Sequence, residues 1–141
     1  MNYRYLFRAK RIDNGEWTYG YLYGIWERKY ILWGMTNNVP DMTEVDPSTI
    51  CQCTGLKDKN GKLIWENDIC RRILLPTKRI EKNFRIAYVP YKCCISAIDL
   101  DGSNITFLSD YINNQYEVEV IGNIFDNKEL LESEDKDESN Y

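Results

Sequence analysis

Three carboxylates in the middle of the chain, Asp58, Glu66 and Asp68, are residues whose type and spacing could support acid–base chemistry. A carboxylate pair acts as acid and base when a cleft holds the two groups at a suitable separation. The chain contains no histidine, and no nucleophile or set of metal ligands accompanies the three acids. Asp68 is better explained as a turn residue that accepts backbone N–H bonds. We therefore predict a protein that is not an enzyme and has no catalytic residues.

The cysteines are the second group of residues that could support chemistry. They are Cys51, Cys53, Cys70, Cys93 and Cys94. Their odd number, with one Cys-x-Cys and one adjacent pair, is unlike a secreted disulfide framework. The number would allow a zinc site, but the usual Cys-x2-Cys knuckle is missing. Alternation along a strand places Cys51 and Cys53 on one face, where reduced thiols pack well. We expect packing thiols, with no metal and no cofactor.

The chain shows no signal for export or membrane insertion. Its first residues lack the apolar segment of a signal peptide, and no stretch approaches the roughly 18 apolar residues of a membrane span. These features predict a cytoplasmic protein without a membrane partner.

The densest basic stretch comprises Arg71, Arg72, Lys78, Arg79 and Lys82. With Tyr88 and Tyr91 nearby, it could contact nucleic acid through phosphates and stacked bases. The alternative is a solvated hairpin whose positive charges neutralise neighbouring acidic residues. The net charge of −4 belongs to the segment from Lys128 onward, so residues 1–127 are neutral overall. Nucleic-acid-binding proteins are usually basic, so we favour the solvated hairpin without excluding nucleic acid.

Four aromatic residues, Trp17, Tyr19, Tyr21 and Tyr23, occupy the odd positions of one predicted strand. They therefore share one face of the sheet. Four large rings exceed what a thin sheet needs for its own core. They form either part of the core or a surface for another subunit or ligand, because Tyr and Trp offer large apolar area with a polar tip.

Short alternating segments separated by turn residues predict a mainly β fold. Asn60-Gly61 suits the positive φ angles of a tight hairpin at the centre of the chain. Residues 35–47 predict a long connection of unassigned role, and residues 77–83 a solvated loop. The strands are expected at 3–9, 16–25, 30–33, 50–53, 63–65, 69–75, 85–89, 93–100, 104–108 and 116–125.

The predicted architecture is an antiparallel meander with a barrel-like or sandwich-like body. We expect a single domain over residues 1–132. Asn127 is expected to cap a short helix, with Glu129 in its first turn. Residues 133–141 are acidic and offer nothing to bury, so they are predicted to form a flexible tail.

The central segment carries a family signature, whose positions are Thr54, Gly55, Asp58, Asn60, Gly61, Glu66 and Asp68. Residues 7–10 with 17–20, and residues 119–125 with 129–131, provide two further blocks in the same order. Together they resemble the YopX protein family, which is encoded by bacteriophages, prophages and bacteria. The sequence departs from the family pattern at Asn67, usually glycine, at Cys53, usually aromatic, and at Lys128, often proline. The resemblance implies a fold and a genomic setting, and no agreed activity.

Three functions remain open at this point. The first is a non-enzymatic accessory protein of phage or prophage type that forms homo-oligomers or binds a protein partner through its aromatic surface. The second is a nucleic-acid-associated module that uses the basic stretch. The third, ranked lowest, is an enzyme of unrecognised class.

Overall fold

The computed structural model describes residues 2–113 and 115–131, and these are mainly antiparallel β structure. The predicted mainly β class is therefore confirmed. Within the described ranges each sheet has two ends and is not closed into a barrel. Backbone contacts divide the chain into two compact units, one ending at Gly55 and the other beginning at Leu56. The single domain stays a prediction, and the predicted tail at 133–141 lies outside the described residues.

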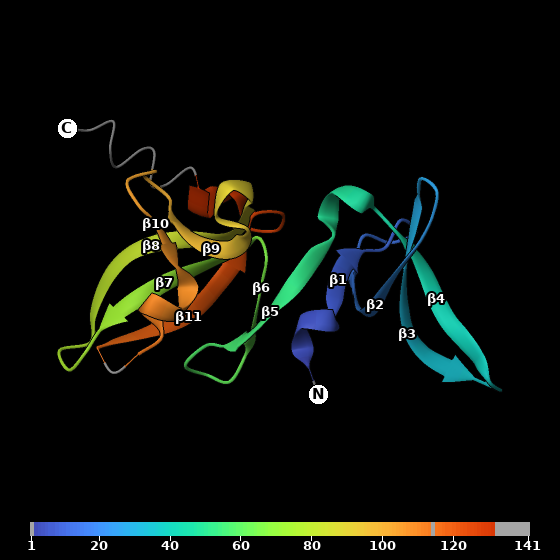
Figure 1. Cartoon of the computed structure of the whole chain (residues 1–141), viewed down its shortest axis with the longest axis horizontal. Helices are drawn as coiled ribbons and strands as arrows, with labels where there is room; N and C mark the ends of the chain where they lie inside the picture. Colours follow the sequence, from blue (N-terminus) through green and yellow to red (C-terminus); the bar gives the residue numbers. More distant parts are fainter. Residues whose placement is uncertain (1, 114, 132–141) are drawn as a thin grey trace. The chain divides into compact units, whose positions relative to one another are not determined.

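The first unit contains five strands in the order β4-β3-β2-β1-β5 (Figure 1). β5 begins there and continues into the second unit. The elements are η1 (Tyr3–Tyr5), β1 (Phe7–Lys10), β2 (Trp17–Ile25), β3 (Arg28–Thr36), β4 (Val39–Val45), η2 (Pro47–Thr49) and β5 (Cys51–Lys57).

The second unit contains a five-stranded sheet in the order β10-β9-β8-β7-β11, coloured from green to orange-red in Figure 1. A single turn of helix covers residues 128–131. The elements are β6 (Leu63–Trp65), β7 (Asp68–Leu74), β8 (Arg79–Val89), η3 (Pro90–Lys92), β9 (Cys94–Asp99), β10 (Ile105–Phe107), η4 (Leu108–Tyr111) and β11 (Tyr116–Asn123).

Each unit has its own apolar core. In the first unit Ala9, Ile31 and Val45 are buried, with Phe7 and Ile50 packed against them. The larger core of the second unit consists of Ile64, Cys70, Phe84, Ile86, Ala97, Leu108, Tyr111 and Val118. Burying a side chain of the size of Ile or Phe contributes about 1.5–3 kcal/mol, so the second unit has the stronger apolar stabilisation.

Two predicted loops are strands in the structure. The connection predicted at 35–47 is the β3–β4 hairpin, whose turn residues Asn37 and Asn38 have φ angles of 52° and 65°. Asparagine tolerates this left-handed region, and Pro40 is accepted because β4 is an edge strand. The loop predicted at 77–83 is the start of β8, which pairs with β7. Exposed charges do not prevent a strand when its backbone is paired.

The two ends of the described chain also differ from expectation. Residues 3–5 form the 3-10 helix η1 in place of the start of a strand, because the side chain of Asn2 accepts a hydrogen bond from the Arg4 N–H. The short helix at 128–131 is present, as predicted. The side chain of Asn127, however, accepts from the Asn123 N–H at 3.0 Å and so braces the preceding turn.

Candidate functional site

Asp58 holds the central turn together. Its Oδ1 accepts hydrogen bonds from the backbone N–H groups of Asn60 and Lys62, both at 2.9 Å. Its Oδ2 accepts from the N–H of Val120 on β11 at 3.1 Å. Gly61 has the expected positive φ, at 80°, whereas Asn60 does not, so that aspect of the hairpin prediction was wrong. The Asp58 side chain stabilises the turn in place of a second left-handed residue.

Asp68 has a similar role in the following turn. It is 1% exposed, and its Oδ2 accepts the Trp65 N–H at 2.8 Å. Between them lies Asn67, whose φ is 69° and whose N–H donates to Ile86 O at 2.6 Å. The C=O of Asn67 accepts from the N–H of Ile124 at 3.0 Å. The predicted role of Asp68 as a turn-capping residue is confirmed.

The remaining signature positions also lie in backbone turns and strands. Gly55 has a φ of 85°, and a Cβ added there would approach Arg4 Cγ to 3.2 Å. Thr54 and Glu66 are half-buried. The hydrogen bonds described above for Asp58 and Asp68 come from backbone N–H groups, so these carboxylates help to shape the chain. Within the described ranges, no group of three or more His, Cys, Asp or Glu side chains could hold a metal ion.

The cysteines are distributed between core and surface. Cys51 and Cys53 are fully buried on β5, as predicted, and Cys51 Sγ lies 3.2 Å from Thr49 O. Cys70 is fully buried in the second core. Burial raises the pKa of the Cys70 thiol well above its usual range, and Asp68 and Asp58 raise it further. Cys70 is therefore an inert packing thiol, because the thiolate is the reactive form.

The structure does not bring the basic stretch together as one cationic surface. Arg71 Nη2 lies 2.6 Å from Glu119 Oε1, and Lys82 Nζ lies 2.7 Å from Asp101 Oδ2. Arg79 Nη2 lies 3.5 Å from Glu81 Oε1. Arg72 stacks on Tyr111 and Tyr116, and Lys78 lies in the exposed β7–β8 turn. Three of the five charges are thus already paired with carboxylates.

The Lys82–Asp101 contact gives a direct test of this pairing. The hydrogen bond from Lys82, aided by the Ser103 side chain and N–H, holds the pKa of Asp101 well below its usual range. We predict that Lys82→Gln raises this pKa towards the ordinary value of about 4, whereas Lys78→Gln leaves it unchanged. The contact stabilises the fold above the unfolded-state pKa, and this stabilisation is lost as pH falls towards the folded-state pKa. A carbon-detected NMR titration of the carboxyl group measures both variants.

The tyrosine face is an exposed apolar surface of the first unit. We define it by Tyr19, Tyr21 and Tyr23 on β2, Leu32 on β3 and Met42 on β4. Strand register places Tyr21 opposite Leu32, and Leu32 opposite Met42, so these side chains form one row across three strands. Tyr19 and Tyr21 are each 50% exposed, and Met42 is 47% exposed. The three tyrosines therefore lie outside the core of their own unit.

Trp17 lies on the same side of β2 but has a different environment. It is half-buried beneath two cations, with the guanidinium carbon of Arg8 4.5 Å and Lys10 Nζ 5.4 Å from its ring. Trp17 therefore contributes to packing within the unit, unlike the three tyrosines.

A hollow of about 470 Å³ opens on the tyrosine face. It runs over the bend of β2, where pairing passes from β1 at Gly20 to β3 at Tyr21. A hollow of this size with mainly apolar side chains suits one or more inserted side chains from a partner. Its lining residues are Leu6, Tyr19, Gly20, Tyr21, Leu32, Trp33, Gly34, Met35 and Pro40.

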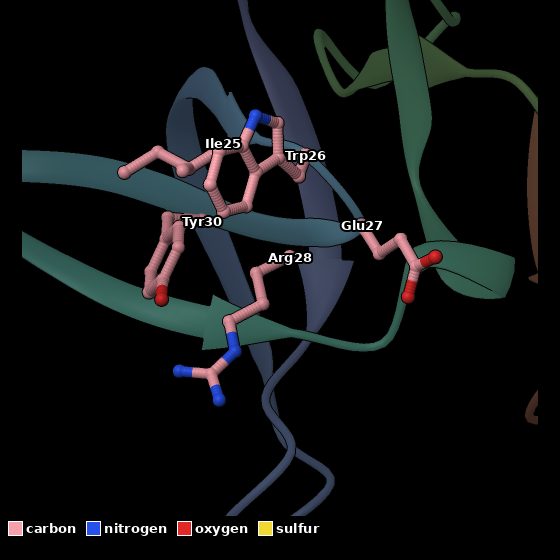
Figure 2. A pocket seen from close by; sticks show the side chains of 5 residues that line it. All are labelled: Ile25, Trp26, Glu27, Arg28 and Tyr30. Atoms are coloured by element: carbon pink, nitrogen blue, oxygen red, sulfur yellow. The ribbon is translucent and has the colours of Figure 1, made fainter.

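A second hollow, of about 730 Å³, lies at the β2–β3 turn. Figure 2 shows its lining side chains, Ile25, Trp26, Glu27, Arg28 and Tyr30, spread apart rather than converging on one point. Small-molecule sites usually have a few converging polar groups, which this hollow lacks. Trp26 is 94% exposed with a φ of 53°, so it presents an indole ring to solvent at the turn.

Comparison with known proteins decides the family. The family model of the YopX protein matches residues 6–132 of the chain. The chain belongs to the YopX family. A search of the curated proteins found no match. The resemblance drawn from the signature is therefore confirmed, and it extends over both units.

YopX membership gives the left-handed turn at Asn67 a simple explanation. The resemblance noted in the sequence implied glycine at this position, and glycine adopts positive φ without steric cost. Asparagine is among the residues that tolerate the same region, so the turn is retained here. The YopX signature thus describes a backbone path and its side-chain braces.

The sequence did not predict that several apolar residues are exposed. Trp26, Trp33, Met35, Val39 and Met42 are all exposed apolar side chains on or beside the β2–β3–β4 hairpins. The many apolar residues between 22 and 42 could have indicated an apolar surface. The prediction of a loop at 35–47 instead of a strand kept this region from being recognised as a sheet face. No helix in the described ranges is long and apolar enough to cross a membrane.

Proposed function

We propose that this YopX protein is a non-enzymatic accessory protein of phage or prophage type that self-associates through the tyrosine face and acts in the cytoplasm. The observation that carries the proposal is the row of Tyr21, Leu32 and Met42, together with the hollow beside it. Monomeric proteins rarely leave a continuous apolar patch of this kind uncovered. Tyrosine and methionine are enriched in protein interfaces, and charged residues are depleted there.

The edge of the sheet is less suited to self-association than its face. Arg11 forms a bridge with Val45, and the N–H of Ile12 donates to Glu44 O, so one end of β4 is covered. Pro40 lacks a donor, and Asp41 lies at the middle of the remaining stretch. Antiparallel pairing of two such stretches would bring two Asp41 carboxylates together. Proline and charge on an edge strand oppose strand addition, so face-to-face packing is favoured.

The chemistry of the other candidate residues supports a binding role over catalysis. Asp58 and Asp68 accept hydrogen bonds from the backbone, and Arg71, Arg79 and Lys82 lie beside carboxylates. These interactions engage both carboxylates and three of the five basic residues, which leaves Arg72 and Lys78 without a carboxylate partner in the described ranges. The five cysteines are all thiols, which agrees with a reducing compartment.

The test is the mass of the protein in solution. We expect the full chain to form a multimer at micromolar concentration, and Tyr21→Glu to weaken self-association at least tenfold, or about 1.4 kcal/mol, because it buries a charge in the contact. Tyr91→Glu is the matched control, since Tyr91 is 75% exposed on η3 and lies outside the tyrosine face. Light scattering and sedimentation over a concentration series measure both variants.

Two results would contradict the proposal. One is a monomeric wild-type chain throughout the micromolar range. The other is equal weakening by Tyr21→Glu and Tyr91→Glu, which would indicate a general effect of charge. Circular dichroism of each variant shows that the strands are retained.

A further inference from the structure

We propose that Arg72, with the rings of Tyr111 and Tyr116, forms a binding site for an oxyanion group, either a carboxylate or a phosphate. The site lies wholly in the second unit, on β7, η4 and β11. It is independent of the tyrosine face, so either proposal can fail without the other.

Two aromatic rings hold the guanidinium of Arg72. Its central carbon lies 4.4 Å from the ring centroid of Tyr111 and 4.8 Å from that of Tyr116. Tyr111 is itself fixed, because it is 6% exposed and its ring packs at 5.1 Å from Phe84. Stacking restricts the arginine to a small set of orientations, so little side-chain entropy remains to be lost when an anion binds.

The donors of Arg72 have no acceptor among residues 2–113 and 115–131. Its Nε is buried without a hydrogen bond, and no carboxylate within these ranges forms an ion pair with its guanidinium. Arg71 Nε is also buried without a hydrogen bond, but Arg71 Nη2 lies 2.6 Å from Glu119, so the missing carboxylate distinguishes Arg72. A buried charged donor without an acceptor is costly and needs an explanation, such as a bound ion. An oxyanion supplies the acceptor that the protein does not.

The strand pairing at Arg72 is also irregular. Pairing of β7 with β8 passes from Arg71–Asn83 to Ile73–Ile80, so Arg72 lies opposite a β-bulge whose extra residue belongs to β8. On the other side of β7, Arg72 remains in register with Val118. Bulges frequently re-aim a side chain next to a functional site. Here the bulge lies opposite an arginine of the basic stretch that has no carboxylate partner in the described chain.

The chemistry of the ligand follows from the guanidinium. Its planar fork of N–H donors matches two oxygens of a carboxylate or phosphate, and it remains charged at any physiological pH. The two tyrosine rings cover part of its surface, which favours binding at an N–H edge in the plane of the group. A planar or tetrahedral oxyanion fits such an edge, whereas a spherical halide gains only charge attraction.

The experiment follows the Nε–Hε resonance of Arg72 in nitrogen-15-labelled full-length protein. Inorganic phosphate and acetate are titrated separately, and sodium chloride is titrated to the same ionic strength. We expect a saturable shift with phosphate or acetate, and no saturable shift with chloride. Which of the two anions binds more tightly distinguishes a phosphate site from a carboxylate site.

Variants supply the controls. Arg72→Lys keeps the charge but loses the fork, so the dissociation constant should rise about tenfold, followed through the backbone amide of Val118. Tyr116→Leu keeps apolar volume and should weaken binding, while Lys78→Gln removes an exposed charge and should change nothing. An unsaturable response to both oxyanions, or a response equal to that of chloride, would overturn the proposal. Equal binding by the wild type and Arg72→Lys would also overturn it.

Discussion

Gly20→Ala is expected to destabilise the first unit by about 3 kcal/mol, at the upper end for overpacking. A Cβ added at Gly20 would lie 2.0 Å from the carbonyl oxygen of Leu32 and 2.8 Å from its carbonyl carbon. Both are backbone atoms, so the strand itself must move. The position is critical because β2 exchanges its partner β1 for β3 at this point.

Gly24→Ala is the matched control for this prediction. It lies on the same strand, and the added Cβ would meet only the side chain of Lys29, nearest at Nζ, 2.9 Å away. That flexible end can move, so we expect a change of about 0.5 kcal/mol or less. Urea unfolding followed by tryptophan fluorescence measures both, because Trp17, Trp26 and Trp33 lie in the first unit. Equal losses for the two variants would contradict the steric argument.

Asp58→Ala is expected to cost the second unit about 3 kcal/mol, because three backbone N–H groups lose a charged acceptor. Two of them belong to the turn, at Asn60 and Lys62, and the third, on Val120, ties the turn to β11. Asp58 is 8% exposed, so water replaces these bonds poorly. The loss should appear in the stability of the second unit, with protection of the Val120 amide against hydrogen exchange reduced first.

Asp58→Asn separates the two aspects of this role. An amide keeps one oxygen for Asn60 and Lys62 but turns an N–H donor towards the Val120 N–H. We therefore expect about half the loss of the alanine variant, concentrated at β11. Denaturant unfolding and hydrogen exchange of the Val120 amide report the two effects. If Asp58→Ala were as stable as the wild type, the turn would not depend on this carboxylate.

Gly20 and Asp58 both act on the backbone of this YopX protein. The signature around Asp58 and Asp68 builds turns, and Gly20 permits a bend. None of them presents a reactive group. The surface that we propose for binding is formed by less distinctive residues, the tyrosines of β2 and the apolar residues of the β3–β4 hairpin. A family signature therefore marks the backbone of this protein better than its contacts.

Local residue types predicted much of the fold. Alternating apolar residues located β2, β7 and β11, and Asp58, Gly61 and Asp68 located the turns around β6. These features are local because a turn or a half-buried strand is encoded within a few residues. The β3–β4 hairpin and the start of β8 were missed because their strand character depends on pairing with neighbours. Pro40 and the charges near Lys82 point locally to loops.

The candidate site was less predictable. Spacing placed Tyr19, Tyr21 and Tyr23 on one face, but it could not show whether another layer covered them. The five basic residues are close together in the sequence, but their spacing does not show which carboxylate or ring each one contacts. Arg71 and Arg72 are adjacent, yet one meets Glu119 and the other two tyrosine rings. The register with β11 makes that difference, because it places Glu119 opposite Arg71 and Val118 opposite Arg72.

The sequence by itself determined the family, the mainly antiparallel β class and the turn-capping role of Asp68. Only the tertiary structure decided which aromatic residues remain exposed, which arginine has no acceptor within the described chain, and where β2 changes its partner. Turn chemistry acts through neighbouring residues along the chain, so it can be recognised in the residue order. Exposure and charge pairing depend on segments far apart in sequence, such as Arg71 and Glu119, and these meet only in the folded protein.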